Sequence, residues 1–290
     1  MVTLLQLCPI WNVKRFSLLQ DAGTIAVCGK RHSFKHHEKY RTQDGALDTW
    51  KASLYQAYVS SGQVQYTGGS AEDFLRGRRA YFQALIRKHF PKHRESRILD
   101  IGCGHGALLY FLGREGYCNL RGADASREQV DLACRLGITG IELGEAEDCL
   151  RACGKESVDV VALFDVLEHL TRQEFFDLLS EVKRVLSPGG MCIGHVPNAA
   201  GLFGAAIRYG DLTHEQAFTE FSIRQAFGAL GFGETRCFED KPVVHGLISL
   251  VRRVIWDVGS APLRLLAVAE TAERGPILSR NLLFVATRRR

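Results

Sequence analysis

The sequence predicts an α/β fold in which a mostly parallel sheet carries helices on both faces. Short apolar segments rich in Val, Ile and Leu alternate with amphipathic, helix-like segments between about residues 97 and 232. A glycine-rich turn follows the first apolar segment and leads directly into a segment of helical character. Strands that alternate with helices in this way are typical of parallel sheets wound on both faces, so we assign the chain to this class.

The predicted elements follow one another in a regular order along the chain. Gly137 is expected to close the second helix, and Pro188 with Gly189 to stop the third. The expected strands lie at 97–101, 119–125, 139–146, 158–166, 191–197, 233–240 and 281–288, and the expected helices at 106–116, 127–137, 171–190 and 219–232.

Composition and periodicity divide the chain into three parts. Its 290 residues are 46% hydrophobic and 24% charged, which is ordinary for a globular protein. Residues 1–50 show no sustained period and are expected to form an extension that is disordered in part. Residues 51–95 form a helical cap, with Ser70 as a helix N-cap and Pro91 after the helix end. Residues 96–290 form the main domain, with a helical insertion at 241–280.

Charge and cysteine usage narrow the class of protein. The net charge is +5, and much of the basic excess lies near the two ends, where it is typical of solvated tails, so nucleic acid is not expected as a partner. The nine cysteines are single and include no Cys-x-x-Cys pair, which favours reduced thiols and disfavours zinc; no bound metal is expected. No apolar run reaches the ~18 residues of a membrane span, so we expect a soluble, cytoplasmic protein.

The glycine-rich turn lies in "RILDIGCGHGALLYFL", residues 97–112. Dinucleotide sites favour G-x-G-x-x-G, but in the trio Gly102, Gly104 and Gly106 the third glycine comes one residue early. Asp100 directly before the turn would repel a pyrophosphate and balance a cation. S-adenosylmethionine carries a sulfonium and an ammonium and has no phosphate, so it fits this turn better than a dinucleotide does.

Acidic side chains follow the next strands. Asp124 ends the second strand, where a carboxylate suits the two ribose hydroxyls of a nucleoside. Glu145 after the third strand could accept from an adenine amino group, and Asp165 ends the fourth strand at the edge where open α/β sheets bind ligands. Each acid has another interpretation, since Asp124 and Asp165 could cap helices and Glu145 could be solvated. Together with Asp100, they place four acids at four successive strand ends, which favours a binding site.

The motifs "ILDIGCGHG", "GADAS", "GEAED", "FDVLEHL" and "VLSPGGMCIGHVPN" together resemble the class I S-adenosylmethionine-dependent methyltransferases of type 11/12-like sequence. The resemblance covers about residues 81–240 and implies a Rossmann-like, seven-stranded sheet with an antiparallel last strand. It also implies S-adenosylmethionine as cofactor and S-adenosylhomocysteine as product. The implied cofactor-binding residues are Asp100, Gly102, Gly104 and Gly106 at the methionine part, Asp124 and Ala125 at the ribose, Glu145 and Ala146 at the adenine, and Asp165 and Val166 at the sulfonium.

Acceptor residues are expected in the loop after the fifth strand, residues 196–222. His214 is the candidate general base, with Asp211 close enough in sequence to orient its ring. The alternative is that Asp211 begins a turn and His214 covers the next helix. The other histidine candidates are His195, His169 and His245, and the expected substrate-binding residues are Asn198, Arg208 and Tyr209.

The same loop, with "KPVVHG", resembles bacterial methyltransferases of polysaccharide and other glycan biosynthesis. This resemblance implies O-methylation of a sugar hydroxyl, on a free, lipid-linked or nucleotide-linked glycan, or of another small-molecule hydroxyl. A quinone-like aromatic acceptor is the first competing hypothesis, and it predicts an apolar pocket where a sugar predicts a polar one. The sequence also leaves open an RNA acceptor, or a binding module with this fold but no turnover.

The insertion at 241–280 carries an apolar stripe at helical spacing. A second apolar segment follows Pro262. Packing on the protein's own core is the default expectation, and a homodimer interface or peripheral membrane contact are the alternatives. The residues of the stripe are Leu247, Leu250, Val251, Val254, Ile255 and Val258.

Overall fold

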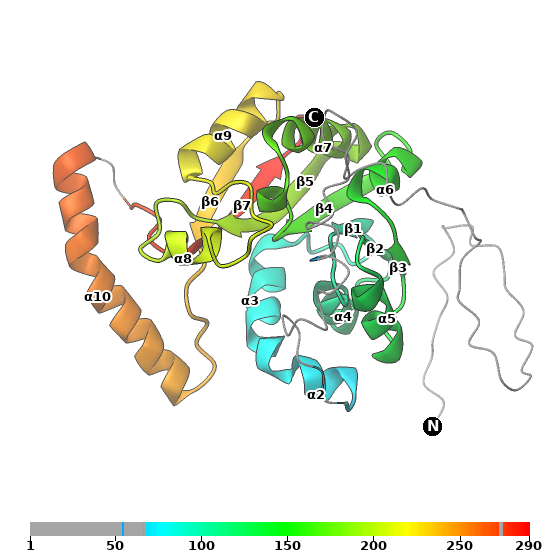
Figure 1. Ribbon diagram of the computed structural model, residues 1–290, viewed down its shortest axis with the longest axis horizontal. Coiled ribbons are helices and arrows are strands. Elements are labelled where there is room, and N and C mark those ends of the chain that lie inside the picture. Colours follow the sequence, from blue (N-terminus) through cyan, green and yellow to red (C-terminus); the bar gives the residue numbers. More distant parts are fainter. Residues whose placement is uncertain (1–53, 55–65, 67, 273–274) are drawn as a thin grey trace, which may run out of the picture.

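The computed structural model describes residues 54, 66, 68–272 and 275–290 (Figure 1). The predicted extension at 1–50 lies outside these residues, as does most of 51–67. Within the described part, one sheet with helices on both faces forms the body of the molecule, as the sequence predicts.

The sheet has seven strands in the order β3-β2-β1-β4-β5-β7-β6. The first five of these are parallel, and β7 runs antiparallel to both of its neighbours, β5 and β6. The expectation of a mostly parallel sheet with an antiparallel last strand is therefore confirmed. The strands are β1 (Ile98–Ile101), β2 (Leu120–Asp124), β3 (Ile141–Leu143), β4 (Val158–Phe164), β5 (Leu186–Pro197), β6 (Thr235–Glu239) and β7 (Asn281–Thr287).

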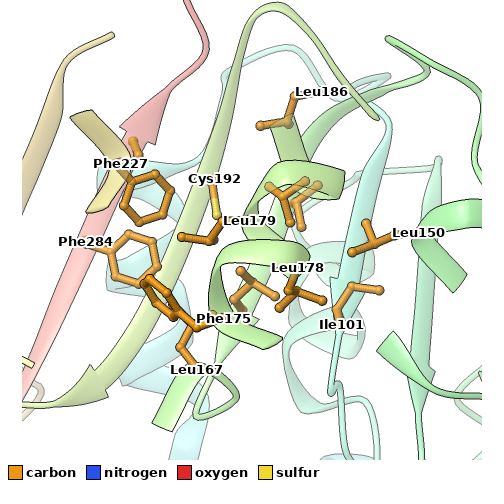
Figure 2. Packing of buried hydrophobic residues seen from close by; sticks show 14 of the residues in the cluster. Ile101, Leu150, Leu167, Phe175, Leu178, Leu179, Leu186, Cys192, Phe227 and Phe284 are labelled. Carbon is orange, nitrogen blue, oxygen red and sulfur yellow. The ribbon is translucent and has the colours of Figure 1, made fainter. Parts of the chain in front are cut away.

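Two layers of helices cover the sheet (Figure 1). Figure 2 shows the core between the sheet and α7, where Phe175, Leu178 and Leu179 meet Phe227 and Phe284. One layer contains α3 (Arg79–His89), α4 (Ala107–Arg114) and α5 (Arg127–Arg135), and the other contains α6 (Ala146–Ala152), α7 (Arg172–Val185) and α9 (Glu220–Ala229).

Two helices, the one in the cap and the one predicted at 171–190, do not have the bounds that the sequence predicts. The cap consists of α2 (Ala71–Leu75), a 3-10 turn η2 (Arg76–Arg78) and α3, and Ser70 caps α2 by accepting from the Asp73 amide. Helix α7 ends at Val185, and β5 begins at once, so Pro188 and Gly189 lie in the strand. The pairing of β4 with β5 shifts register after Val158, which accommodates this irregular start.

The insertion forms one helix, α10 (Leu247–Thr271), which continues through Pro262. The sequence indicates two apolar segments divided at this proline, because a proline inside a helix removes a backbone donor. The default expectation that the apolar stripe packs in the core is wrong, since Leu247, Val254 and Val258 are exposed. The buried residues of α10 are Ser249 and Ser260.

Gly194 in the middle of β5 tests the packing of the sheet. A Cβ at this position would lie 2.3 Å from Phe284 Cζ and 2.6 Å from the Leu163 carbonyl oxygen. We expect Gly194→Ala to lower the free energy of unfolding by about 1–3 kcal/mol in urea denaturation, because a packed core resists added volume. Gly228→Ala on α9, where a Cβ has open space, is the control and should not destabilise the protein. Equal stability of the two variants would contradict this packing.

Candidate functional site

The loop after β1 brings bare backbone against the ends of β2 and β4. Gly102, Gly104 and Gly106 have φ angles of +67°, +55° and +80°, in the left-handed region that favours glycine. The Gly102 amide donates to the Ala123 carbonyl at 2.8 Å. A Cβ on Gly102 would lie 2.5 Å from Val166 Cγ2, so the close approach of loop and strand end requires glycine.

Asp124 at the end of β2 fastens this loop. Its Oδ2 accepts from the Gly104 amide at 2.7 Å, and its Oδ1 accepts from the Ser126 amide at 2.8 Å. Each carboxylate oxygen has a second lone pair, so both remain able to accept from ribose hydroxyls. Ser126 is the N-cap of α5, so the alternative that Asp124 caps this helix does not hold.

Two further acids surround the loop. Burial raises the pKa of Asp100 well above its usual value, and the Asp124 carboxylate adds to the effect. Burial likewise raises the pKa of Asp124, with a contribution from Glu145, although two backbone donors act to lower it. Glu145 occupies the N-cap position of α6 and is half-buried. The structure thus brings the predicted acids together around the glycine loop, at the carboxyl edge of the sheet.

A buried histidine lies beside Asp165, the residue after β4. His195 Nδ1 lies 2.7 Å from Asp165 Oδ1, and its Nε2 lies 3.2 Å from Asp240 Oδ2. Burial acts to lower the pKa of His195, but the two carboxylates outweigh it and raise the pKa to about 10. A histidine that is charged at neutral pH has no free lone pair, so His195 is excluded as a general base.

A pocket of about 320 Å³ opens next to Asp165. Its walls come from the segment after β4, from the loop between β5 and α9, and from the first residue of β7. The loop includes α8 (Gly204–Arg208), and the segment after β4 includes a 3-10 turn, η3 (Leu167–His169). The lining residues are Asp165, Glu168, His169, Ala206, Ile207, Gly210, Asp211, His214 and Asn281.

Both members of the predicted catalytic pair line this pocket, but they do not form the expected hydrogen bond. Asp211 Oδ1 accepts from the Thr213 amide at 2.8 Å and from its hydroxyl at 2.6 Å, while Thr213 Oγ1 lies 2.8 Å from His169 Nδ1. His214 Nδ1 donates instead to the Ile207 carbonyl at 3.0 Å. Asp211 therefore forms the predicted turn and positions Thr213, and the Ile207 carbonyl orients His214.

Glu168 is a pocket residue that was not among the candidates from the sequence, although it lies inside the quoted "FDVLEHL". Its Oε2 is buried and has no hydrogen-bond partner among the described residues. Burial, and then the neighbouring Asp165 carboxylate, raises the pKa of Glu168 well above its usual value. Glu168, His169 and His214 each offer one ligand atom, all within 4.8 Å of one another, so this group could hold a metal ion, contrary to the expectation of none.

The three predicted substrate-binding residues have other roles. Asn198 is buried, and its Nδ2 donates to the carbonyls of Ile277 and Ser279, both at 2.8 Å. Arg208 donates to the carbonyls of His214 and Glu215 and so holds the loop together.

Tyr209 is 78% exposed and lies outside the pocket lining. His245, the remaining histidine candidate, is also exposed and contacts the Val243 carbonyl. None of Asn198, Arg208 and Tyr209 lines this pocket, and their contact with a substrate stays a prediction.

The methyltransferase domain family matches residues 74–233, more than half of the chain, so the chain belongs to this family. A ubiquinone biosynthesis O-methyltransferase of Sinorhizobium medicae is 34% identical over 125 residues, which are 39% of this chain and 49% of that protein. The chain spans about half the length of such curated relatives.

Solved structures share the fold. A SAM-dependent methyltransferase from Archaeoglobus fulgidus has a TM-score of 0.55 at 22% identity and covers 74% of this chain and 97% of its own. A protein from Pyrococcus horikoshii has a TM-score of 0.52 at 16% identity, over 79% of this chain and 97% of its own. The fold is therefore that of the class I methyltransferases.

S-adenosylmethionine is accordingly the cofactor, and the site fits it. The glycine loop offers a cradle that a Cβ at Gly102 or Gly106 would fill, and no basic side chain is needed because the cofactor carries no phosphate. Among the helices of the described residues, none has the length and apolar character needed to cross a membrane.

Gly102→Ala tests the cradle. The substitution forces a side chain into the left-handed region and against Val166, so we expect the dissociation constant of S-adenosylmethionine to rise at least about tenfold in calorimetry. Gly116→Ala is a matched control, because Gly116 also has a positive φ, +91°, but a Cβ there meets nothing within 4 Å. Comparable affinity in both variants would place the cofactor away from this loop.

His195→Gln tests the buried cation. In the unfolded chain a histidine loses its proton at about pH 6.5, whereas His195 in the folded protein keeps its proton up to about pH 10. The stability from this proton is therefore fully present below the lower value and lost as the pH rises toward the upper one. We expect wild-type unfolding free energy to fall more steeply than that of the variant, by up to ~1.4 kcal/mol per pH unit, in urea titrations between these values.

His93→Gln is the control for this comparison, because His93 is an exposed histidine whose contact with the Glu95 carboxylate is long, at 3.9 Å. The free energy of unfolding of His93→Gln should change with pH in the same way as that of the wild type. Parallel slopes for the wild type and His195→Gln would contradict a charged His195.

Proposed function

We propose that this chain transfers a methyl group from S-adenosylmethionine to a hydroxyl oxygen of a sugar or another polar small molecule. The observation that supports this proposal is the polar pocket beside the cofactor loop. Five of its nine lining residues carry an acidic or imidazole side chain. A polar lining suits an acceptor with several hydroxyls, which need hydrogen-bond partners once they leave water.

When bound, the cofactor supplies an electrophilic methyl group on its sulfonium. His214 is the group placed to take the proton from the acceptor hydroxyl. Its Nδ1 contacts a carbonyl oxygen, which only accepts, so Nδ1 carries the ring proton and Nε2 keeps a free lone pair. That tautomer is the one a general base requires.

Two other pocket groups complete the proposed arrangement. Glu168 Oε2 is buried and has no partner among the described residues, so it is available for a hydrogen bond with the acceptor. Asp211 accepts a hydrogen bond from the Thr213 hydroxyl, and Thr213 Oγ1 in turn contacts His169 Nδ1. The His169 ring lies beside the His214 ring, with the two imidazole centroids 4.7 Å apart. These contacts orient the acceptor and leave the proton transfer to His214.

A quinone-derived phenol is the second candidate acceptor, and the names of the curated relatives favour it. The same base and the same cofactor would serve a phenol. The buried Glu168 Oε2, which has no partner among the described residues, favours the sugar, because an aromatic ring with an apolar tail would leave this oxygen without one.

The test is a transfer assay with labelled S-adenosylmethionine on glycans, phenols and RNA, next to calorimetry of cofactor binding. Label in a glycan hydroxyl supports the first candidate, and label in a phenol supports the second. Label in RNA overturns both. A chain that binds no cofactor at high micromolar concentration is not a methyltransferase, and one that binds it without transfer is a silent binding module.

His214→Ala tests the proposed base. We expect turnover to fall by about 100- to 10,000-fold, because a positioned base contributes about that much, while cofactor affinity in calorimetry stays unchanged. His245→Ala, which removes an exposed histidine outside the pocket, should keep wild-type turnover. If His214→Ala stays within a few-fold of the wild type, His214 is not the base.

A further inference from the structure

Helix α10 is amphipathic, and the side that faces the protein carries polar residues together with the half-buried Trp256. Ser249 and Ser260 are buried, and Arg253 and Arg264 on the same side are half-buried. These residues recur at intervals of four, seven and four along the helix, the spacing of one helical face. In a surface helix of a globular protein the apolar face is the one that turns inward. Here that arrangement is reversed.

Ion pairs fix this orientation. Arg264 donates to both carboxylate oxygens of Glu239 on β6, at 2.7 and 2.9 Å, and to the Pro276 carbonyl at 2.7 Å. The Glu239 side chain is only 8% exposed. Lys241 bridges Glu239 at 3.0 Å and Asp257 of α10 at 3.3 Å. Turning the helix over would remove the Arg264 guanidinium from the buried Glu239 carboxylate, which is unfavourable although Lys241 would still pair with it.

The outward side of α10 is apolar over most of its length. Exposed fractions reach 77% for Leu247, 80% for Ile248 and 71% for Leu265. At about 100° per residue, the outward apolar residues occupy an arc of about 160° around the helix axis, with Leu250 at one edge and Ile248 at the other. A two-helix interface buries a narrower stripe, so a face this wide exceeds what one partner helix covers. The outward apolar residues are Leu247, Ile248, Leu250, Val251, Val254, Ile255, Val258, Leu265 and Leu266.

Exposed apolar residues also lie on the loop of the acceptor pocket. The segment after α10 is bonded to the pocket loop, since the Leu202 amide donates to the Leu278 carbonyl at 3.1 Å. Leu202 and its neighbour Phe203 are 42% and 61% exposed. In Figure 1, α10 lies apart from the other helices, beyond the β6 edge of the sheet. The segment that follows α10 is therefore anchored on the loop that lines the pocket.

The charge of the insertion is positive. Residues 241–280 include six Lys or Arg and three Asp or Glu, a net charge of +3. Lys241, Arg253 and Arg264 are engaged in ion pairs with Asp257 and Glu239. The basic residues exposed in the described part of the insertion are therefore Arg252 and Arg280, and Glu270 is the exposed acid of α10 outside these pairs. Basic residues beside an apolar helix face complement the anionic headgroups of a lipid bilayer.

We propose that the outward face of α10 docks in the interface of an anionic lipid bilayer, with the helix axis in the membrane plane. The apolar side chains enter the boundary between headgroups and acyl chains, and the basic residues contact the headgroups. The docked enzyme then meets acceptors carried by a lipid. That last consequence rests on the proposed methyl transfer, whereas the docking itself does not.

Vesicle binding of the full chain tests the proposal. Liposomes of phosphatidylcholine with about one third phosphatidylglycerol are incubated with the wild type and floated on a density gradient. The wild type should float with the vesicles. The double variant Ile248→Asp and Ile255→Asp, which places two carboxylates on the outward face, should lose at least about tenfold in partitioning. Phe221→Asp on α9, 75% exposed in the wild type, is the matched control and should float as the wild type does.

Two results would overturn the docking. The first is a wild type that stays with the soluble fraction, or a double variant that floats equally well. The second is a lipid-free wild-type dimer that becomes monomeric in the double variant, which would assign the face to a second copy of the chain.

Calorimetry with S-adenosylmethionine on the same proteins separates this outcome from the proposed function. If the wild type binds the cofactor but not the vesicles, only the docking proposal is overturned. If it binds no cofactor, the proposed function is overturned, whatever the result with vesicles. Retained cofactor affinity also shows that the double variant is folded.

Discussion

The left-handed backbone of the glycine loop is the constraint on which the rest of the site depends. Because Gly102 and Gly106 carry no Cβ, the loop after β1 can pass within contact of Val166, which follows β4, and of Ile141, the first residue of β3. The parallel strands then end at one edge, where Asp124 ties the loop to β2. Any side chain at Gly102 would separate the cofactor cradle from the segment that begins the acceptor pocket.

Periodicity and short-range chemistry predicted the strands, the helices and the glycine loop, because each signal lies within a few residues of the element it defines. The direction in which α10 faces could not be read in this way. Its apolar stripe is plain in the sequence, but its orientation is set by the pairing of Arg264 with Glu239, 25 residues apart. Likewise, Pro188 predicted a helix stop, whereas pairing of Leu186 with Val158 of the neighbouring strand starts β5 earlier.

The acceptor side of the site was less predictable for the same reason. Asp211 and His214 are near in sequence, yet other contacts at the site join residues 44 or 45 positions apart, as in His169 with Thr213 and His195 with Asp240. Their proximity in sequence predicted that Asp211 and His214 are partners, but in the folded loop Asp211 accepts from Thr213 instead. Glu168 Oε2, which has no partner among the described residues, could be recognised only once its surroundings are packed.

The pocket and α10 together restrict the chemical class of the acceptor more than either does alone. A free sugar would use the polar pocket and leave the apolar face of α10 without a purpose. A membrane quinone would use the apolar face but place an apolar ring among Asp165, Glu168 and the pocket histidines. A polar, hydroxyl-bearing group attached to a lipid satisfies both surfaces, since its head requires hydrogen-bond partners and its carrier stays in the bilayer. The proposed sugar acceptor and the proposed membrane docking therefore select the same chemistry, a lipid-linked glycan.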